Sequence, residues 1–154
     1  MGDLAHLAAM LVFVIALSAC FAKVEIHIEG EAGWAASLPT WRIEKHWLLD
    51  LFFGGRPLTG YHAWVLPFSL GLFHFPILLW WHWSWTVEAR ILGCFMVFWI
   101  CEDLLWFVLN PAWGLRRFNR CEVRWHKHWL LGLPSDYWLF AAIAAGLLWW
   151  SLRG

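Results

Sequence analysis

Residues 89–109 read ARILGCFMVFWICEDLLWFVL, a long apolar stretch that Glu102 and Asp103 interrupt near its end. A membrane-spanning helix needs roughly 20 mostly apolar residues, and three further stretches approach that length: residues 4–22, 62–83 and 137–152. The chain of 154 residues is 62% hydrophobic and 14% charged, whereas a soluble domain has about 25% charged residues. We therefore expect an all-α integral membrane protein with four transmembrane helices, in a single membrane domain over residues 1–154.

The charge balance and the missing motifs exclude several classes of protein. The 11 Lys and Arg residues offset 11 Asp and Glu residues, which is unlike a basic nucleic-acid-binding module, and the apolar content is too high for a disordered chain. The four cysteines show no disulfide, redox or metal-binding spacing. No Gly-rich phosphate loop and no GxSxG nucleophile motif occurs. The lipid bilayer is the expected partner, with no nucleic acid.

The distribution of basic residues predicts the orientation in the membrane. Nine of the 11 Lys and Arg residues fall in the loops after the first and third apolar stretches, and only Arg90 and Arg153 fall on the other side. Since cytoplasmic loops are rich in Lys and Arg, we expect both termini outside the plasma membrane of a bacterium or archaeon. Residues 17–20 resemble a lipoprotein cleavage box, but Asp3 stands where a basic region belongs, so we interpret the stretch as a retained helix.

A short sequence repeat suggests internal duplication. Residues 42–51 (RIEKHWLLDL) and 124–133 (RWHKHWLLGL) are identical at seven of ten positions. Each copy lies between an odd and an even apolar stretch, which predicts two parallel repeats, residues 1–83 and 84–154. Each copy has the composition of an amphipathic helix at the membrane interface, with Trp and Leu toward the acyl chains and basic residues at the headgroups. The predicted unit is therefore span, interfacial helix, span.

The two acidic residues of the third span need partners. Glu102 and Asp103 lie about two turns before Asn110, so roughly 10–12 Å inside the hydrocarbon at 1.5 Å per residue. A charge at such depth costs about 2.5 kcal/mol or more on insertion scales. We predict that at least one of these carboxylates contacts an imidazole of His62, His126 or His128. Asp103 shares a helix face with Asn110, seven residues on.

Two interpretations of these acidic residues remain open. In one, carboxylates and imidazoles bind iron, manganese or zinc at the end of the bundle that carries the basic loops. In the other, the acidic residues form salt bridges with Arg116, Arg117 or Arg124. The candidate metal ligands are Glu25, His27, Glu29, His46, His62, Glu102, Asp103, His126 and His128.

The segment 25–29 (EIHIE) supports the same clustering in either conformation. As a strand, its alternation places Glu25, His27 and Glu29 on one edge. As a continued helix, it still aligns Glu25 with Glu29 at the i, i+4 spacing.

These features favour a membrane-embedded, metal-dependent enzyme that acts on a lipid or other apolar substrate at the cytoplasmic face. Glu102 and Asp103 would be ligands or the general acid and base. Arg42 and Arg124 would hold an anionic headgroup, and Asn110 would join them in substrate binding. Two alternatives stay open. One is a non-enzymatic accessory subunit that binds a partner helix, a carotenoid or a porphyrin, and the other is a small proton-coupled transporter. A homo-oligomer or a membrane-protein partner is compatible with each hypothesis.

Overall fold

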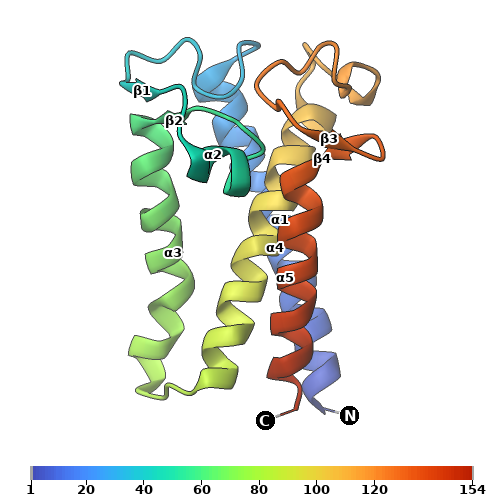
Figure 1. Ribbon diagram of the computed structural model, residues 1–154. Helices are drawn as coiled ribbons and strands as arrows, with labels where there is room; N and C mark the ends of the chain where they lie inside the picture. Colours follow the sequence, from blue (N-terminus) through green and yellow to red (C-terminus); the bar gives the residue numbers. More distant parts are fainter. Residues whose placement is uncertain (1, 154) are drawn as a thin grey trace.

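Four long helices stand side by side in the computed structural model, which describes residues 2–153 (Figure 1). They are α1 (Gly2–Glu29), α3 (Gly60–Trp80), α4 (Trp85–Leu109) and α5 (Ser135–Ser151). A fifth, short helix, α2 (Trp47–Phe52), lies across one end of the bundle. The prediction of a mostly helical protein is confirmed.

Three of these helices are long and apolar enough to cross a membrane: Leu4–Glu29, Gly60–Trp80 and Trp85–Leu109. This supports membrane association. Helix α5 has 17 residues, about 26 Å at 1.5 Å per residue, and its role as a fourth span stays a prediction.

The helix boundaries follow from local capping. Helix α1 continues to Glu29 rather than ending at Ala22, so the helical alternative for segment 25–29 is the right one. It stops where Gly30 adopts a positive φ of 67°. Helix α4 starts at Trp85, because the side chain of Ser84 accepts a hydrogen bond from the backbone N–H of Val87 at 3.2 Å.

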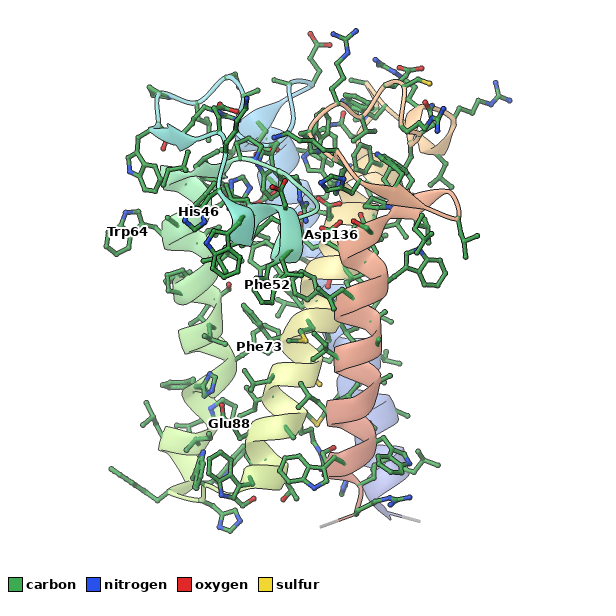
Figure 2. The ribbon with its side chains drawn as sticks, in the orientation of Figure 1. His46, Phe52, Trp64, Phe73, Glu88 and Asp136 are labelled. Atoms are coloured by element: carbon green, nitrogen blue, oxygen red, sulfur yellow. The ribbon has the colours of Figure 1, made fainter. Side chains whose placement is uncertain are left out.

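Helix α4 lies at the centre and packs along both α1 and α5. Its contact with α5 is close because Gly93 presents no side chain to Leu148. Helix α3 makes few contacts with α4, and Figure 2 shows Phe73 lying between them. Near the end that carries the termini, His74 Nε2 lies 3.0 Å from Glu88 Oε1 and joins the two helices. Helix α3 is therefore the least tightly packed of the four long helices.

The two basic loops cover the same end of the bundle, and both termini lie at the other end (Figure 1). The first loop (residues 30–59) contains α2 and a pair of antiparallel strands, β1 (Arg42–Ile43) and β2 (Leu58–Thr59). The third loop (residues 110–134) contains the 3₁₀ turn η1 (Leu115–Arg117) and the strand pair β3 (Trp129–Leu130) and β4 (Leu133–Pro134). This grouping agrees with the charge pattern, whereas the side of the membrane that the loops face stays a prediction.

Aromatic side chains anchor the third loop on the bundle. Trp125 stacks on Phe107 with ring centres 5.8 Å apart, and Trp113 lies 5.2 Å from Trp125. Val123 is fully buried beside Phe107. Part of the high Trp content thus serves packing at this end.

The two copies of the sequence repeat adopt different local structures. Residues 47–52 form helix α2, whereas the corresponding part of residues 124–133 forms strand β3 and a turn. Leu131 and Gly132 both have positive φ, as a two-residue hairpin of type I′ requires. Gly132 stands where the first copy has Asp50, and Pro134 prevents a helix from continuing. The prediction of a second interfacial helix is therefore wrong, and the structure gives no support to the repeat architecture.

Candidate functional site

Arg56 is the centre of a buried ion-pair network at the loop-covered end. Its Nη1 donates to Asp103 Oδ1 on α4 at 3.0 Å, and its Nη2 donates to Asp136 Oδ2 on α5. The guanidinium also lies 4.1 Å from the ring centre of Trp34. Burial by itself lowers the pKa of Arg56, but the charges of Asp103 and Asp136 outweigh it and raise this pKa above its usual value. Arg56 therefore stays cationic.

His126 confirms the predicted contact between an intramembrane carboxylate and an imidazole. Its Nε2 lies 3.1 Å from Asp103 Oδ2, and the residue is 2% exposed. Tyr137 donates its hydroxyl hydrogen to the same oxygen of Asp103. Figure 2 shows Asp136 at the start of α5, below the third loop, and its Oδ1 lies 3.7 Å from His126 Nδ1.

Every oxygen of the Asp103 carboxylate is thus engaged. Its three partners come from the first loop, the third loop and α5, so Asp103 joins these segments to α4. The salt-bridge interpretation correctly named an arginine, but the partner is Arg56 and not Arg116, Arg117 or Arg124. Arg117 instead pairs with Glu122 at 2.7 Å.

A cavity of about 360 Å³ extends from this network down between the helices. On α4 its lining runs from Phe95 to Phe107, and on α3 from His62 to Leu70. At 1.5 Å per residue these ranges span about 12–18 Å along the bundle axis. The lining is ionisable near the loops and apolar toward the middle of the bundle. Pro67 on α3 lines the cavity and is exposed.

Three buried polar atoms on one face of α4 have no hydrogen-bond partner within residues 2–153. They are Trp99 Nε1, Glu102 Oε1 and Trp106 Nε1, and their side chains all line the cavity. The spacing i, i+3, i+7 places them on one face of the helix. Glu102 is 3% exposed and forms no ion pair with any of the described residues. A buried polar group without a partner is costly, so the fold alone does not account for these three residues.

The other wall of the cavity's polar end is held by local contacts. His62 stacks on Trp34 with ring centres 3.8 Å apart, and its Nδ1 lies 2.7 Å from Thr59 Oγ1. Glu25 accepts a hydrogen bond from the Tyr61 hydroxyl at 2.9 Å. Glu29 accepts one from the backbone N–H of Ala35 at 2.5 Å. The predicted residues Glu25, Glu29, His62, Glu102 and Asp103 therefore line one cavity.

Three other predicted metal ligands lie away from the cavity. His27 is exposed and its Nδ1 lies 2.7 Å from the carbonyl oxygen of Lys23. His46 caps α2, where it accepts from the backbone N–H of Leu48. His128 lies at the surface, 3.5 Å from Asp50 Oδ1. Within the described chain, no group of three or more His, Cys, Asp or Glu residues could hold a metal ion, so the predicted iron, manganese or zinc site finds no support.

The three predicted substrate-binding residues, Asn110, Arg42 and Arg124, lie outside the cavity. Asn110 is 3% exposed and donates from Nδ2 to the carbonyl oxygen of Gly30, which ties the end of α4 to the end of α1. Arg42 donates to the backbone carbonyls of Trp34 and Ala35. Arg124 is exposed. None of the three lines the cavity.

Sequence reasoning missed Arg56, Tyr137 and the role of Asp136. Arg56 stands in Gly54-Gly55-Arg56-Pro57, which has the composition of a simple turn, and Asp136 has the position of a residue that opens a helix. Only contacts between distant segments reveal their pairing. A signal for Trp99 and Trp106 did exist, because both flank the acidic pair at helical spacing.

Comparisons with protein-family models, curated proteins and solved structures give no match to this chain.

Proposed function

We propose that the protein is a membrane-embedded enzyme that acts on a lipid or other apolar molecule at the membrane face covered by the first and third loops. The observation that carries the proposal is the cavity: an apolar body leads to a polar end where Glu102 Oε1 has no hydrogen-bond partner among residues 2–153. Enclosed, mostly apolar cavities with a few convergent polar groups are typical ligand sites. An intramembrane carboxylate that the fold does not employ is a functional candidate.

The proposal divides the two adjacent acidic residues. Glu102 is the candidate general acid or base, because it lines the cavity and its buried Oε1 has no hydrogen-bond partner among the described residues. His62 is the candidate second group, since it lines the same end and bonds Thr59 through Nδ1. Asp103 is a positioning residue, because Arg56, His126 and Tyr137 occupy both of its oxygens.

Conversion of lipid by the purified protein tests this proposal. The wild type, Glu102→Gln and the control Glu31→Gln, whose carboxyl is exposed outside the cavity, are placed in nanodiscs with a total membrane lipid extract. Mass spectrometry follows each lipid species with time. We expect the wild type and the control to convert one species over many turnovers. Glu102→Gln should convert this species at least about 100-fold more slowly, because a general acid or base contributes about 10²–10⁴-fold to the rate.

Unchanged lipids with all three proteins would contradict the enzyme proposal and favour the accessory-subunit or transporter hypothesis. Elemental analysis of the untagged protein tests the sequence-based prediction of a metal in the same preparation. The proposed acid–base residues, Glu102 and His62, both line the cavity, and their proposed roles require no metal.

A further inference from the structure

We infer that the cavity receives a single-chain amphiphile with a small, hydrogen-bond-donating head that bears no negative charge, namely a long-chain amine or alcohol. The head lies at Glu102 and the chain extends along α4 toward Phe95. The inference rests on the proposed function, because it names the substrate class of the same cavity.

The unpartnered atoms set the chemistry of the head. Glu102 Oε1 needs a hydrogen-bond donor, and the indole N–H groups of Trp99 and Trp106 need an acceptor. A hydroxyl or an amine supplies a donor to Glu102, and a hydroxyl also accepts from an indole. A buried, unpaired polar group is expensive, so a ligand that satisfies these atoms gains affinity.

The charges around the cavity disfavour anionic heads. Five carboxyl residues line it: Glu25, Glu29, Glu102, Asp103 and Asp136. Arg56 is the only Lys or Arg among the described lining residues, and it is already paired with Asp103 and Asp136. A phosphate or carboxylate head would therefore meet acidic groups with no uncommitted arginine or lysine to offset them, and like charges in such a low-dielectric site repel strongly.

The aromatic lining suits a head that is neutral or cationic. Four tryptophans line the cavity: Trp34, Trp99, Trp106 and Trp125. Indole faces attract ammonium groups, and they also pack against neutral heads. Trp34 already carries the Arg56 guanidinium on its ring, which illustrates the preference of this end for cations.

The size of the cavity favours one chain and a small head. Its volume of about 360 Å³ is near the lower end of the range of ~300–1,000 Å³ that holds drug-sized ligands. Below the acidic residues, the lining consists of side chains such as Leu66, Leu70, Phe95 and Phe140. Pro67 lines the cavity and is exposed on α3, the least tightly packed of the long helices, so the proposed ligand enters from the lipid phase beside α3.

Binding of four matched probes in nanodiscs of zwitterionic lipid tests the inference. The probes are hexadecylamine, hexadecan-1-ol, hexadecanoate and hexadecyl phosphate, with affinity measured by native mass spectrometry. We expect the amine, the alcohol or both to bind about tenfold more tightly than either anion. Glu102→Gln should weaken binding of the amine about tenfold or more, because it removes a charged partner. Binding of the alcohol should change little in this variant, because the amide oxygen still accepts, whereas Trp99→Phe should weaken it.

The controls are Glu31→Gln and Trp64→Phe. Figure 2 shows Trp64 pointing away from the bundle, and it is 76% exposed, so neither control should alter binding. Circular dichroism verifies that each variant is folded. The head is an amine if the wild type binds hexadecylamine more tightly than the alcohol and this binding depends on Glu102. It is an alcohol if the wild type binds hexadecan-1-ol more tightly and this binding depends on Trp99.

Equal or tighter binding of an anionic probe, lost in Glu102→Gln or Trp99→Phe, would overturn the inference and leave the lipid-enzyme proposal standing. Binding that no cavity variant alters would also overturn the inference. In that case turnover of the lipid extract decides the enzyme proposal separately.

Discussion

Glu102 and Asp103 are adjacent in sequence and both line the cavity, but their hydrogen bonds differ. Successive residues of a helix point about 100° apart, and only Asp103 bonds to the loops and α5. Asp103 accepts hydrogen bonds from three side chains of other segments. Glu102 Oε1 accepts none from the described residues. One carboxylate therefore joins segments of the fold, and the other has an oxygen that the described residues leave without a hydrogen bond.

This difference predicts opposite effects on stability. Asp103→Asn should destabilise the protein by about 3–5 kcal/mol, because it leaves Arg56 buried with one charged partner fewer. Glu102→Gln should be neutral or stabilising, since it removes a buried carboxylate whose Oε1 has no hydrogen-bond partner in residues 2–153. Thermal and denaturant unfolding in the same detergent, followed by circular dichroism, compares the two. A loss of stability in Glu102→Gln as large as that in Asp103→Asn would contradict this division of roles.

At the scale of elements, α4 organises the bundle through close packing on two sides. A Cβ at Gly93 would lie 2.7 Å from Leu148 Cγ and 3.4 Å from the carbonyl oxygen of Ala144. Ser18 on α1 lies 3.0 Å from the carbonyl oxygen of Phe98 on the same helix α4. Small residues let helix backbones approach closely in membranes, where van der Waals packing drives association.

We predict that Gly93→Ala destabilises the protein by about 1–3 kcal/mol, because the added methyl group forces α5 away from α4. Gly146→Ala is the matched control: it lies on α5 with no atom within 4 Å of the added Cβ. There the greater helix propensity of Ala should be neutral or should stabilise by about 0.5–1 kcal/mol. Unfolding midpoints of both variants check this. Equal midpoints for the two would show that the α4–α5 contact is looser than the structure indicates.

At the scale of the whole molecule, the charge distribution and the fold agree. The first and third loops carry eight of the 11 Lys and Arg residues, and Lys23 lies in the last two turns of α1. Both loops lie at one end of the bundle, opposite both termini (Figure 1). The backbone carbonyl of Gly54 in the first loop accepts from the backbone N–H groups of Lys127 and His128 in the third. The two loops thus form one polar cover, which should face the cytoplasm.

Native Cys121 permits a test of this orientation, since it is exposed in the third loop. In a variant that keeps Cys121 as its only cysteine, a membrane-impermeant maleimide should react only after the cells are permeabilised. A cysteine-free chain with Arg153→Cys, at the opposite end, should react in intact cells. The reverse pattern of labelling would invert the orientation.

The sequence by itself predicted long apolar helices, because apolar stretches of about 20 residues leave few other structures available to the backbone in a membrane. The structure has three helices long and apolar enough to cross one. The sequence also predicted the grouping of the basic loops at one end and an imidazole partner for at least one of Glu102 and Asp103. Each of these follows from properties of local segments: their length, their apolar content and the cost of a charge at depth. Local pattern failed for residues 124–133, where Gly132 and Pro134 override the resemblance to the first copy.

Only the tertiary structure decided what each ionisable residue does. It paired Arg56 with Asp103 and Asp136, across separations of 47 and 80 residues. It also placed His27, His46 and His128 outside the predicted site. Finally, it placed Trp99, Glu102 and Trp106 in the lining of one cavity, where Nε1 of each tryptophan and Oε1 of Glu102 have no hydrogen-bond partner in the described chain. The physical reason is that hydrogen bonding and burial depend on which segments lie in contact in space. Neither the spacing of residues in the sequence nor the amino-acid composition specifies those contacts.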